Sequence, residues 1–95
     1  MALKDINPIA PVHILVVPKR HIESIDKIEE DDSYLVGKLC YIAKKIAEGT
    51  IVPDIRTPQG YKLLFRVGEW GGQVVPHIHL HLIGGAKLIE EINPI

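Results

Sequence analysis

The clearest alternation of apolar and polar residues lies at residues 77 to 82, where the sequence "HIHLHL" places a histidine at every second position. Because successive side chains of a β-strand point to opposite faces, this period predicts a strand with its imidazoles on one face and its aliphatic side chains on the other. On a helix of about 3.6 residues per turn, the same spacing would put neighbouring rings on opposite sides. Pro76 before the run and Gly84 after it are typical of strand boundaries.

Two further stretches indicate strands. "VHILVV", residues 12 to 17, is rich in β-branched residues and stands between two prolines. Its alternation places His13 on one face and Val12, Ile14 and Val16 on the other. "YKLLFRV", residues 61 to 67, is joined to the histidine run by the glycine-rich "GEWGGQVVP". We expect the strands on either side of this loop to form an antiparallel hairpin.

One stretch has the period of a helix. In "DDSYLVGKLCYIAKKIAEG", residues 31 to 49, the apolar residues Leu35, Leu39, Ile42 and Ile46 recur at helical spacing. Acidic residues precede it, lysines lie near its end, and Gly49 supplies a stop. The fold class predicted is therefore α+β, a small antiparallel sheet whose apolar face is covered by one long helix and whose other face carries the histidines.

Composition and charge exclude several classes of function. The chain of 95 residues is predicted to form a single domain over residues 1–95, and its formal net charge is −1 with scattered lysines and arginines. This balance argues against nucleic acid as a partner. No apolar run approaches the roughly 18 residues of a membrane span. Cys40 is the single cysteine, so no internal disulfide can form. We expect a cytoplasmic protein without a membrane partner.

The alternating histidines have three possible explanations at this point. Polar rings can occupy the solvent face of a strand without any chemical role. Imidazoles are also the commonest zinc ligands, although three in succession converge poorly on one ion and no Cys, Asp or Glu stands beside them. A histidine can instead attack phosphorus while its neighbours orient it. His13 is predicted to lie within reach of the run, whereas His21, in a turn after "PKR", is interpreted as structural.

The run "VVPHIHLHLIGG" resembles the signature of histidine-triad (HIT) nucleotide-binding proteins, in which three histidines alternate with hydrophobic residues. "DINPIAPVHILVVPKRHI" is similar to the segment that opens the central strand of that family, and "GGQ" is similar to its phosphate loop. Spacing and order agree from about Asp5 to Gly85, and the branch most resembled is the Hint type. The resemblance implies a homodimer with a continuous sheet across both subunits, acting as a purine nucleoside phosphoramidate hydrolase without a cofactor or metal.

The resemblance also implies roles for four histidines. His79 is similar to the nucleophile that attacks the α-phosphorus and forms a nucleotidyl-histidine intermediate, which water later hydrolyses. His77 would orient this ring with support from His13. His81 would contact the phosphate or the leaving group.

The same resemblance implies a binding set for the nucleotide. Gln73 and the backbone around Gly72 would hold phosphate oxygens, Asp5 would bind the ribose, and Ile6 would contact the base. Arg66 stands where Hint-type members usually have an asparagine near the phosphate. It is either a phosphate ligand, since arginine binds phosphate through paired donors, or a solvated arginine.

Two further departures from the family pattern affect the expected activity. Val74 occupies a position where many members carry a hydroxyl that helps the leaving group. Members also carry an N-terminal hairpin before the position of Leu3 that forms much of the purine pocket, so the resemblance indicates an N-terminally short domain. The alternatives to a phosphoramidate hydrolase are a dinucleoside polyphosphate hydrolase of the same fold and a catalytically impaired nucleotide-binding or interaction protein.

Overall fold

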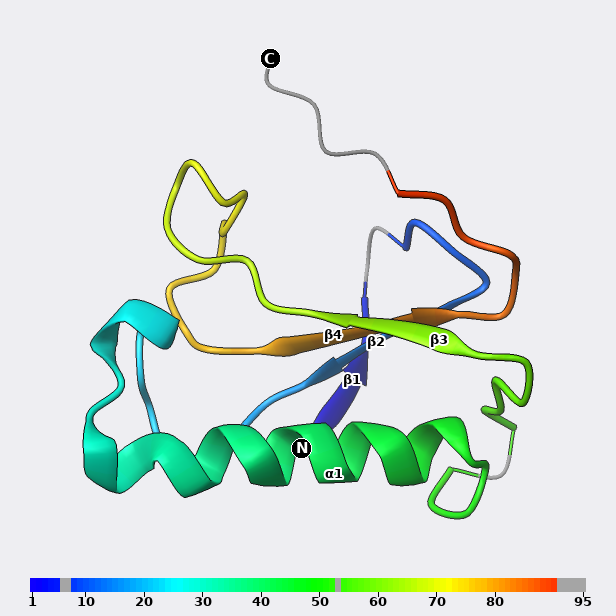
Figure 1. Cartoon of the computed structure of the whole chain (residues 1–95), viewed down its shortest axis with the longest axis horizontal. Helices are drawn as coiled ribbons and strands as arrows, with labels where there is room; N and C mark the ends of the chain where they lie inside the picture. Colours follow the sequence, from blue (N-terminus) through cyan, green and yellow to red (C-terminus); the bar gives the residue numbers. More distant parts are fainter. Residues whose placement is uncertain (6–7, 53, 91–95) are drawn as a thin grey trace.

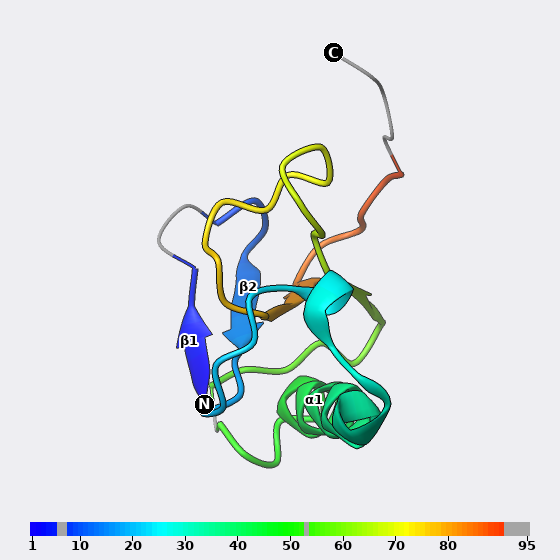
Figure 2. The same cartoon turned by 90° about the vertical axis from the view of Figure 1, so that its left-hand side faces the viewer.

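The chain folds into a sheet backed by one long helix, as Figure 1 shows for the computed structural model, which describes residues 1–5, 8–52 and 54–90. The described strands form one antiparallel sheet in the order β1-β2-β4-β3. The elements are β1 Ala2–Lys4, β2 Val12–Val16, the 3₁₀ turns η1 Ile25–Lys27 and η2 Glu30–Asp32, α1 Ser33–Ala47, β3 Tyr61–Leu64 and β4 Leu80–Gly84. This arrangement confirms the predicted α+β class, with the helix on one side of the sheet (Figure 2).

The apolar face of the sheet packs against α1 and forms the core. The core consists of buried side chains from β2, α1, the loop after α1 and β4: Ile14, Val16, Leu39, Ala43, Ile46, Ala47, Ile55, Leu80 and Leu82. The alternation predicted for "VHILVV" is confirmed, because Ile14 and Val16 lie in this core while His13 points to the other face. Packing the helix on the sheet removes apolar surface from water, which stabilises the fold by about 25 cal/mol for each Å² buried.

The two central strands determine the register of the histidine face. His13 of β2 pairs with Ile83 of β4, and His81 pairs with Leu15 on one side and Leu64 of β3 on the other. Directly paired residues share a face of the sheet, so His13 and His81 lie on the face opposite α1. The predicted hairpin between β3 and β4 is confirmed by their antiparallel pairing.

Two strand boundaries differ from those predicted, and one strand was not predicted. The strand expected over the whole histidine run begins only at Leu80, because the Ile78 N–H donates to the carbonyl of Ile22 rather than to a neighbouring strand. The strand expected over "YKLLFRV" ends at Leu64. Residues Ala2–Lys4, which have no strand signal of their own, become β1 by pairing with β2.

The predicted helix and its stop at Gly49 are confirmed. α1 ends at Ala47, and Gly49 adopts a positive φ of 81° while its N–H donates to the Ile46 carbonyl at 3.0 Å. A Cβ at this position would lie 2.5 Å from Cγ of Arg56. None of the described helices combines the length and the apolar character needed to cross a bilayer.

Two glycine substitutions are expected to change stability in opposite directions. Gly49→Ala should lower the free energy of unfolding by about 1–2 kcal/mol, because left-handed backbone is costly for residues with a Cβ. Gly37→Ala, at an exposed site of α1 where a Cβ meets nothing within 4 Å, should raise it by about 0.5–1 kcal/mol. Urea unfolding measures both changes, and a shift of the same sign in the two variants would contradict this account.

Candidate active site

His13 and His81 form a buried pair on the face of the sheet opposite α1. They are 5% and 4% exposed, and Nε2 of His13 lies 2.9 Å from Nδ1 of His81. The Ile9 N–H donates to Nδ1 of His13 at 3.2 Å, so the proton of a neutral His13 resides on Nε2. That N–H faces both His81 and the carboxylate Oδ2 of Asp5, which is 3.3 Å away.

Burial keeps both rings of this pair uncharged near neutral pH. It lowers the pKa of His81 to about 4, and the nearby charge of Arg66 acts in the same direction. Burial also lowers the pKa of His13, which Asp5 partly opposes and Arg66 reinforces. The pair therefore offers hydrogen bonds at neutral pH rather than positive charge.

His79 lies just before β4 and has one ring nitrogen held in place. Its Nδ1 is 2.7 Å from the backbone carbonyl of His77, and because a carbonyl only accepts, Nδ1 carries the proton. In the neutral ring Nε2 then keeps its lone pair. The ring is half-buried, and its centroid is 4.9 Å from that of His81. This is the arrangement that a nucleophilic imidazole requires.

The ring of His77 makes different contacts from those predicted. Its Nε2 lies 3.0 Å from the carbonyl of Pro18, and its Nδ1 lies 2.8 Å from Nδ1 of His21. The expected support of His77 by His13 is not among the contacts of the described residues, in which His13 bonds to His81. His79 is held by the backbone carbonyl of His77, and no described contact joins the two rings.

His21 makes a contact that the sequence does not predict. The sequence indicates a structural residue in a turn, and the structure adds that its ring contacts that of His77 with centroids 5.0 Å apart. The two residues are 56 positions apart in the chain, so no local period could have linked them. The "PKRH" segment after β2 has no pattern that predicts this contact, and its one relevant feature is the histidine itself.

The glycine-rich loop holds its predicted phosphate donors in internal hydrogen bonds. The N–H groups of Gly72 and Gln73 donate to the carbonyls of Glu69 and Gly68, both at 3.0 Å. The side-chain amide of Gln73 donates to the Glu23 carbonyl at 2.6 Å and accepts the Gly68 N–H at 3.0 Å. A phosphate at this loop would have to take over donors that now close the turn.

Arg66 brings a fixed positive charge to the buried pair. Its Nη1 lies 3.1 Å from Nε2 and 3.4 Å from Nδ1 of His81. The side chain also covers the glycine loop, since a Cβ on Gly72 would lie 3.2 Å from Cδ of Arg66. Arg66 is half-buried in these contacts, and its choice between a phosphate ligand and a solvated side chain stays a prediction.

Asp5 completes the cluster at the end of β1. It is partly buried and its carboxylate approaches His13, while Ile6, predicted to contact the base, lies outside the described residues. Asp5, His13 and His81 offer ligand atoms within 4.8 Å of one another and could hold a metal ion. The guanidinium of Arg66 beside His81 opposes a divalent cation there by charge repulsion, so hydrogen bonding accounts for this group more simply than metal binding does.

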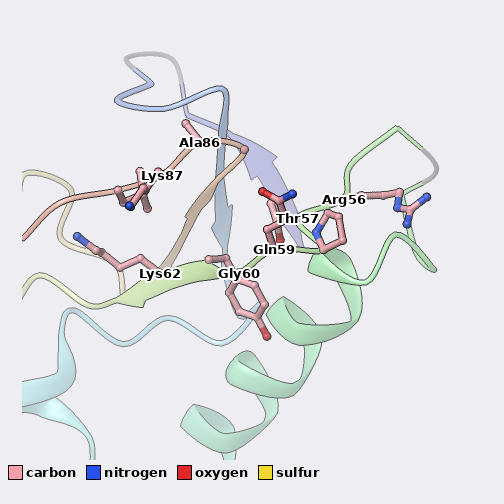
Figure 3. A pocket seen from close by; sticks show the side chains of 11 residues that line it. Arg56, Thr57, Gln59, Gly60, Lys62, Ala86 and Lys87 are labelled. Atoms are coloured by element: carbon pink, nitrogen blue, oxygen red, sulfur yellow. The ribbon is translucent and has the colours of Figure 1, made fainter.

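A cavity of about 710 Å³ lies at the other end of the β3–β4 hairpin (Figure 3). Lys62 and Lys87 stand on one side of it and Arg56 on the other. Lys62 is already paired with the Glu90 carboxylate at 3.2 Å. Strand β4 of five residues, about 17 Å long at 3.3 Å per residue, separates this cavity from His79, so the proposed nucleophile is not located here.

The antiparallel sheet of the described residues, its covering helix and the clustered imidazoles define a small histidine-triad domain of the α+β class. Residues 1–88 match the family model described as the HIT domain, and the chain belongs to this family.

Known proteins agree with this assignment. A HIT-like protein of Buchnera aphidicola is 44% identical over 87 residues, which cover 92% of this chain and 74% of the relative. A HIT family hydrolase from Legionella pneumophila superposes with a TM-score of 0.81 at 43% identity, covering 93% of this chain and 75% of that one. A histidine triad protein from Clostridium difficile gives a TM-score of 0.85 at 36% identity, with 96% and 76% covered. The chain therefore has the fold of HIT family hydrolases.

Proposed function

We propose that this protein is a nucleotide hydrolase or transferase that acts at the α-phosphate of purine nucleotides and cleaves nucleoside phosphoramidates. The observation that carries the proposal is the distance of 2.7 Å between Nδ1 of His79 and the His77 carbonyl. Because a carbonyl only accepts, this contact places the proton of the neutral ring on Nδ1 and leaves Nε2 its lone pair. The Legionella pneumophila neighbour, described as a hydrolase, supports hydrolysis. A histidine triad nucleotide-binding protein from Candida albicans, with a TM-score of 0.65 at 28% identity, supports a nucleotide ligand.

The proposed reaction has two steps at phosphorus. Nε2 of His79 attacks the α-phosphorus, and the bond from phosphorus to the leaving amine breaks as the amine takes up a proton. Water then attacks the nucleotidyl-histidine, releasing the nucleoside monophosphate and neutral His79. Because Val74 offers no hydroxyl at the edge of the glycine loop, the leaving group takes its proton from solvent or from a neighbouring imidazole.

Charge on the phosphoryl oxygens requires donors that are already in place. Arg66 brings a fixed positive charge against His81, and His81 in turn contacts the ring of His79. We assign the phosphoryl oxygens mainly to Arg66. His81, held from behind by His13, would contact them once the Arg66 guanidinium turns from Nε2 of His81 to the phosphate. Gly72 and Gln73 would hold phosphate oxygens through donors that now close the turn of the glycine-rich loop.

The proposal extends to the rest of the nucleotide and to the assembly. Asp5 would bind the ribose and Ile6 the base. The protein would act in the cytoplasm as a homodimer, in which an edge strand of one sheet pairs with that of a second copy. Edge strand β3 exposes Tyr61 and Leu63 by 40% and 37%, and unpaired edges with apolar side chains favour such pairing.

One observation favours a second substrate class for the same site. Arg66 places a permanent positive charge beside His81, and such a charge favours an anionic leaving group over an amine. A dinucleoside polyphosphate, whose leaving group is itself a nucleotide, would benefit from it. The comparison of the two substrates on one enzyme preparation decides between them.

The proposed function is tested by trapping the intermediate. The protein is mixed with adenosine 5′-phosphoramidate, quenched within one turnover and examined by intact mass and peptide mapping. One nucleotidyl group on the peptide containing His79 is expected, with a bond that is labile in acid and stable in base. The same experiment with diadenosine polyphosphate and with added chelator serves as comparison. If the protein binds nucleotide but forms neither adduct nor product from either substrate, hydrolysis is contradicted. The alternative of a catalytically impaired nucleotide-binding protein would then hold.

A further inference from the structure

The segment that carries the nucleophile lies outside the sheet and therefore needs another support. β4 begins at Leu80, so residues 73–79, the histidine segment, have no strand partner on either side. Buried or partly buried polar groups need hydrogen bonds from elsewhere. Residues 18–23, which follow β2 and are called here the supporting segment, provide them.

Four hydrogen-bond contacts join the two segments. They are Nε2 of His77 to the Pro18 carbonyl at 3.0 Å, Nδ1 of His21 to Nδ1 of His77 at 2.8 Å, the Ile78 N–H to the Ile22 carbonyl at 2.6 Å, and the Gln73 amide nitrogen to the Glu23 carbonyl at 2.6 Å. Two of the four end on the ring of a single residue, His77. That ring is therefore the main side-chain link between the segments.

The proton positions in this link follow from the acceptors. The Pro18 carbonyl can only accept, so Nε2 of His77 carries a proton. In neutral His77 the other nitrogen, Nδ1, has a lone pair and needs a donor. The group opposite is Nδ1 of His21, which must therefore carry its own proton and donate it. The contact between the rings is thus a directed hydrogen bond from His21 to His77.

We propose that His21 is a positioning residue for the nucleophile, acting through His77. By donating to His77 it keeps that ring bound to Pro18, and this fixes the peptide whose carbonyl accepts the Nδ1–H of His79. The inference rests on the proposed function, because it assumes that Nε2 of His79 is the attacking atom. The inference adds the supporting segment to the residues that position the proposed nucleophile.

If His21 had a purely structural role, its removal would lower the stability of the fold. The structure gives little reason to expect this. The side chain of His21 is exposed and belongs to no apolar cluster of the described core, so its removal exposes little surface and should leave the fold intact. The effect of losing it should appear in the orientation of His77 and His79 and in turnover. Orientation of a nucleophile affects the transition state more than substrate binding.

Three variants separate the hydrogen bond from the shape of the ring. His21→Ala removes both. His21→Phe keeps a ring but has no donor. His21→Asn keeps a donor, because its amide nitrogen stands one bond beyond Cγ as Nδ1 of histidine does. Lys19→Ala, an exposed neighbour in the same segment, is the matched control.

Two readouts are taken on each variant. Long-range ¹H–¹⁵N spectra of the imidazoles report the tautomers of His77 and His79 in the folded protein without any substrate. Steady-state hydrolysis of adenosine 5′-phosphoramidate gives kcat and KM. We expect His21→Ala and His21→Phe to convert His79 into a mixture of tautomers and to lower kcat roughly tenfold, the range of one net hydrogen bond, with KM changed less than about twofold. His21→Asn should restore both, and Lys19→Ala should resemble the unmodified protein.

The tautomer readout keeps this inference separate from the proposed function. If the unmodified protein hydrolyses neither substrate, the proposed function fails, and a tautomer change of His79 in His21→Ala still supports the link. An unchanged His79 tautomer in His21→Ala overturns the inference whatever the activity. Equal kcat values for His21→Ala and Lys19→Ala, or no recovery in His21→Asn, overturn it as well.

Discussion

Replacement of His79 by alanine is expected to lower turnover by at least about a thousandfold, the scale found when an essential nucleophile is removed. The reason is that Nε2 of His79 is the ring nitrogen left unprotonated by the bond to the His77 carbonyl. His81 cannot replace it, because its ring is 4% exposed and its two nitrogens face His13 and Arg66. The adduct of the trapping experiment should disappear together with turnover.

Two measurements make this first prediction specific. Nucleotide binding to His79→Ala, followed by calorimetry, should remain within about tenfold of the unmodified protein, since the phosphate is assigned mainly to Arg66 and charge-assisted bonds dominate such contacts. Lys38→Ala, exposed on α1 on the other side of the sheet, is the control and should keep full activity. Continued nucleotidylation of His79→Ala would show that another residue is the nucleophile.

Stability is expected to fall by about 3 kcal/mol as the pH is lowered from about 6.5 to about 4, through the titration of His81 alone. Burial beside the charge of Arg66 depresses the pKa of folded His81 to about 4, whereas the unfolded chain has the ordinary value of 6.5. Between these values the unfolded state binds more protons than the folded state, so the free energy of unfolding rises with pH in that window. The stabilisation is complete above the unfolded pKa of 6.5. It decreases as the pH falls below that value and is lost as the pH falls through the folded pKa of about 4. His13, whose pKa is also lowered by burial, acts in the same direction.

Urea unfolding at constant ionic strength across this pH window measures the effect. His81→Asn is the matched comparison, because an amide is neutral throughout the window. This variant will have a lower stability at neutral pH, yet its stability should depend less steeply on pH. The same pH dependence in both proteins would mean that carboxylates, and not the buried ring, are responsible.

Much of the fold could be predicted because its signals are local. The alternation of "VHILVV" placed Ile14 and Val16 on the core face, and the helical spacing of Leu39 and Ile46 placed both against them. Each follows from the geometry of a single element, in which side-chain direction depends only on the residue number. Gly49 as the helix stop has the same origin, since its positive φ is a property of one residue.

The site could be predicted in its residue types but not in its contacts. The period of the histidine run suggested three rings in a row, but Pro76 and the bond from Ile78 to Ile22 keep the first part of the run out of the sheet. The ring of His77 therefore contacts that of His21, and the ring of His13 contacts that of His81. Arg66, which the sequence left open between a ligand and a solvated side chain, reaches His81 from the end of β3.

What the amino-acid sequence determined by itself is the set of elements and the faces of those elements, because periods of two and of about 3.6 residues are written along the chain. Only the tertiary structure decided which imidazole faces which, and hence where each proton resides. The partners in the two histidine pairs are 68 and 56 residues apart. The position of a ring proton depends on the acceptor opposite it, and that acceptor is brought there by strand pairing and loop packing rather than by any neighbour in the chain.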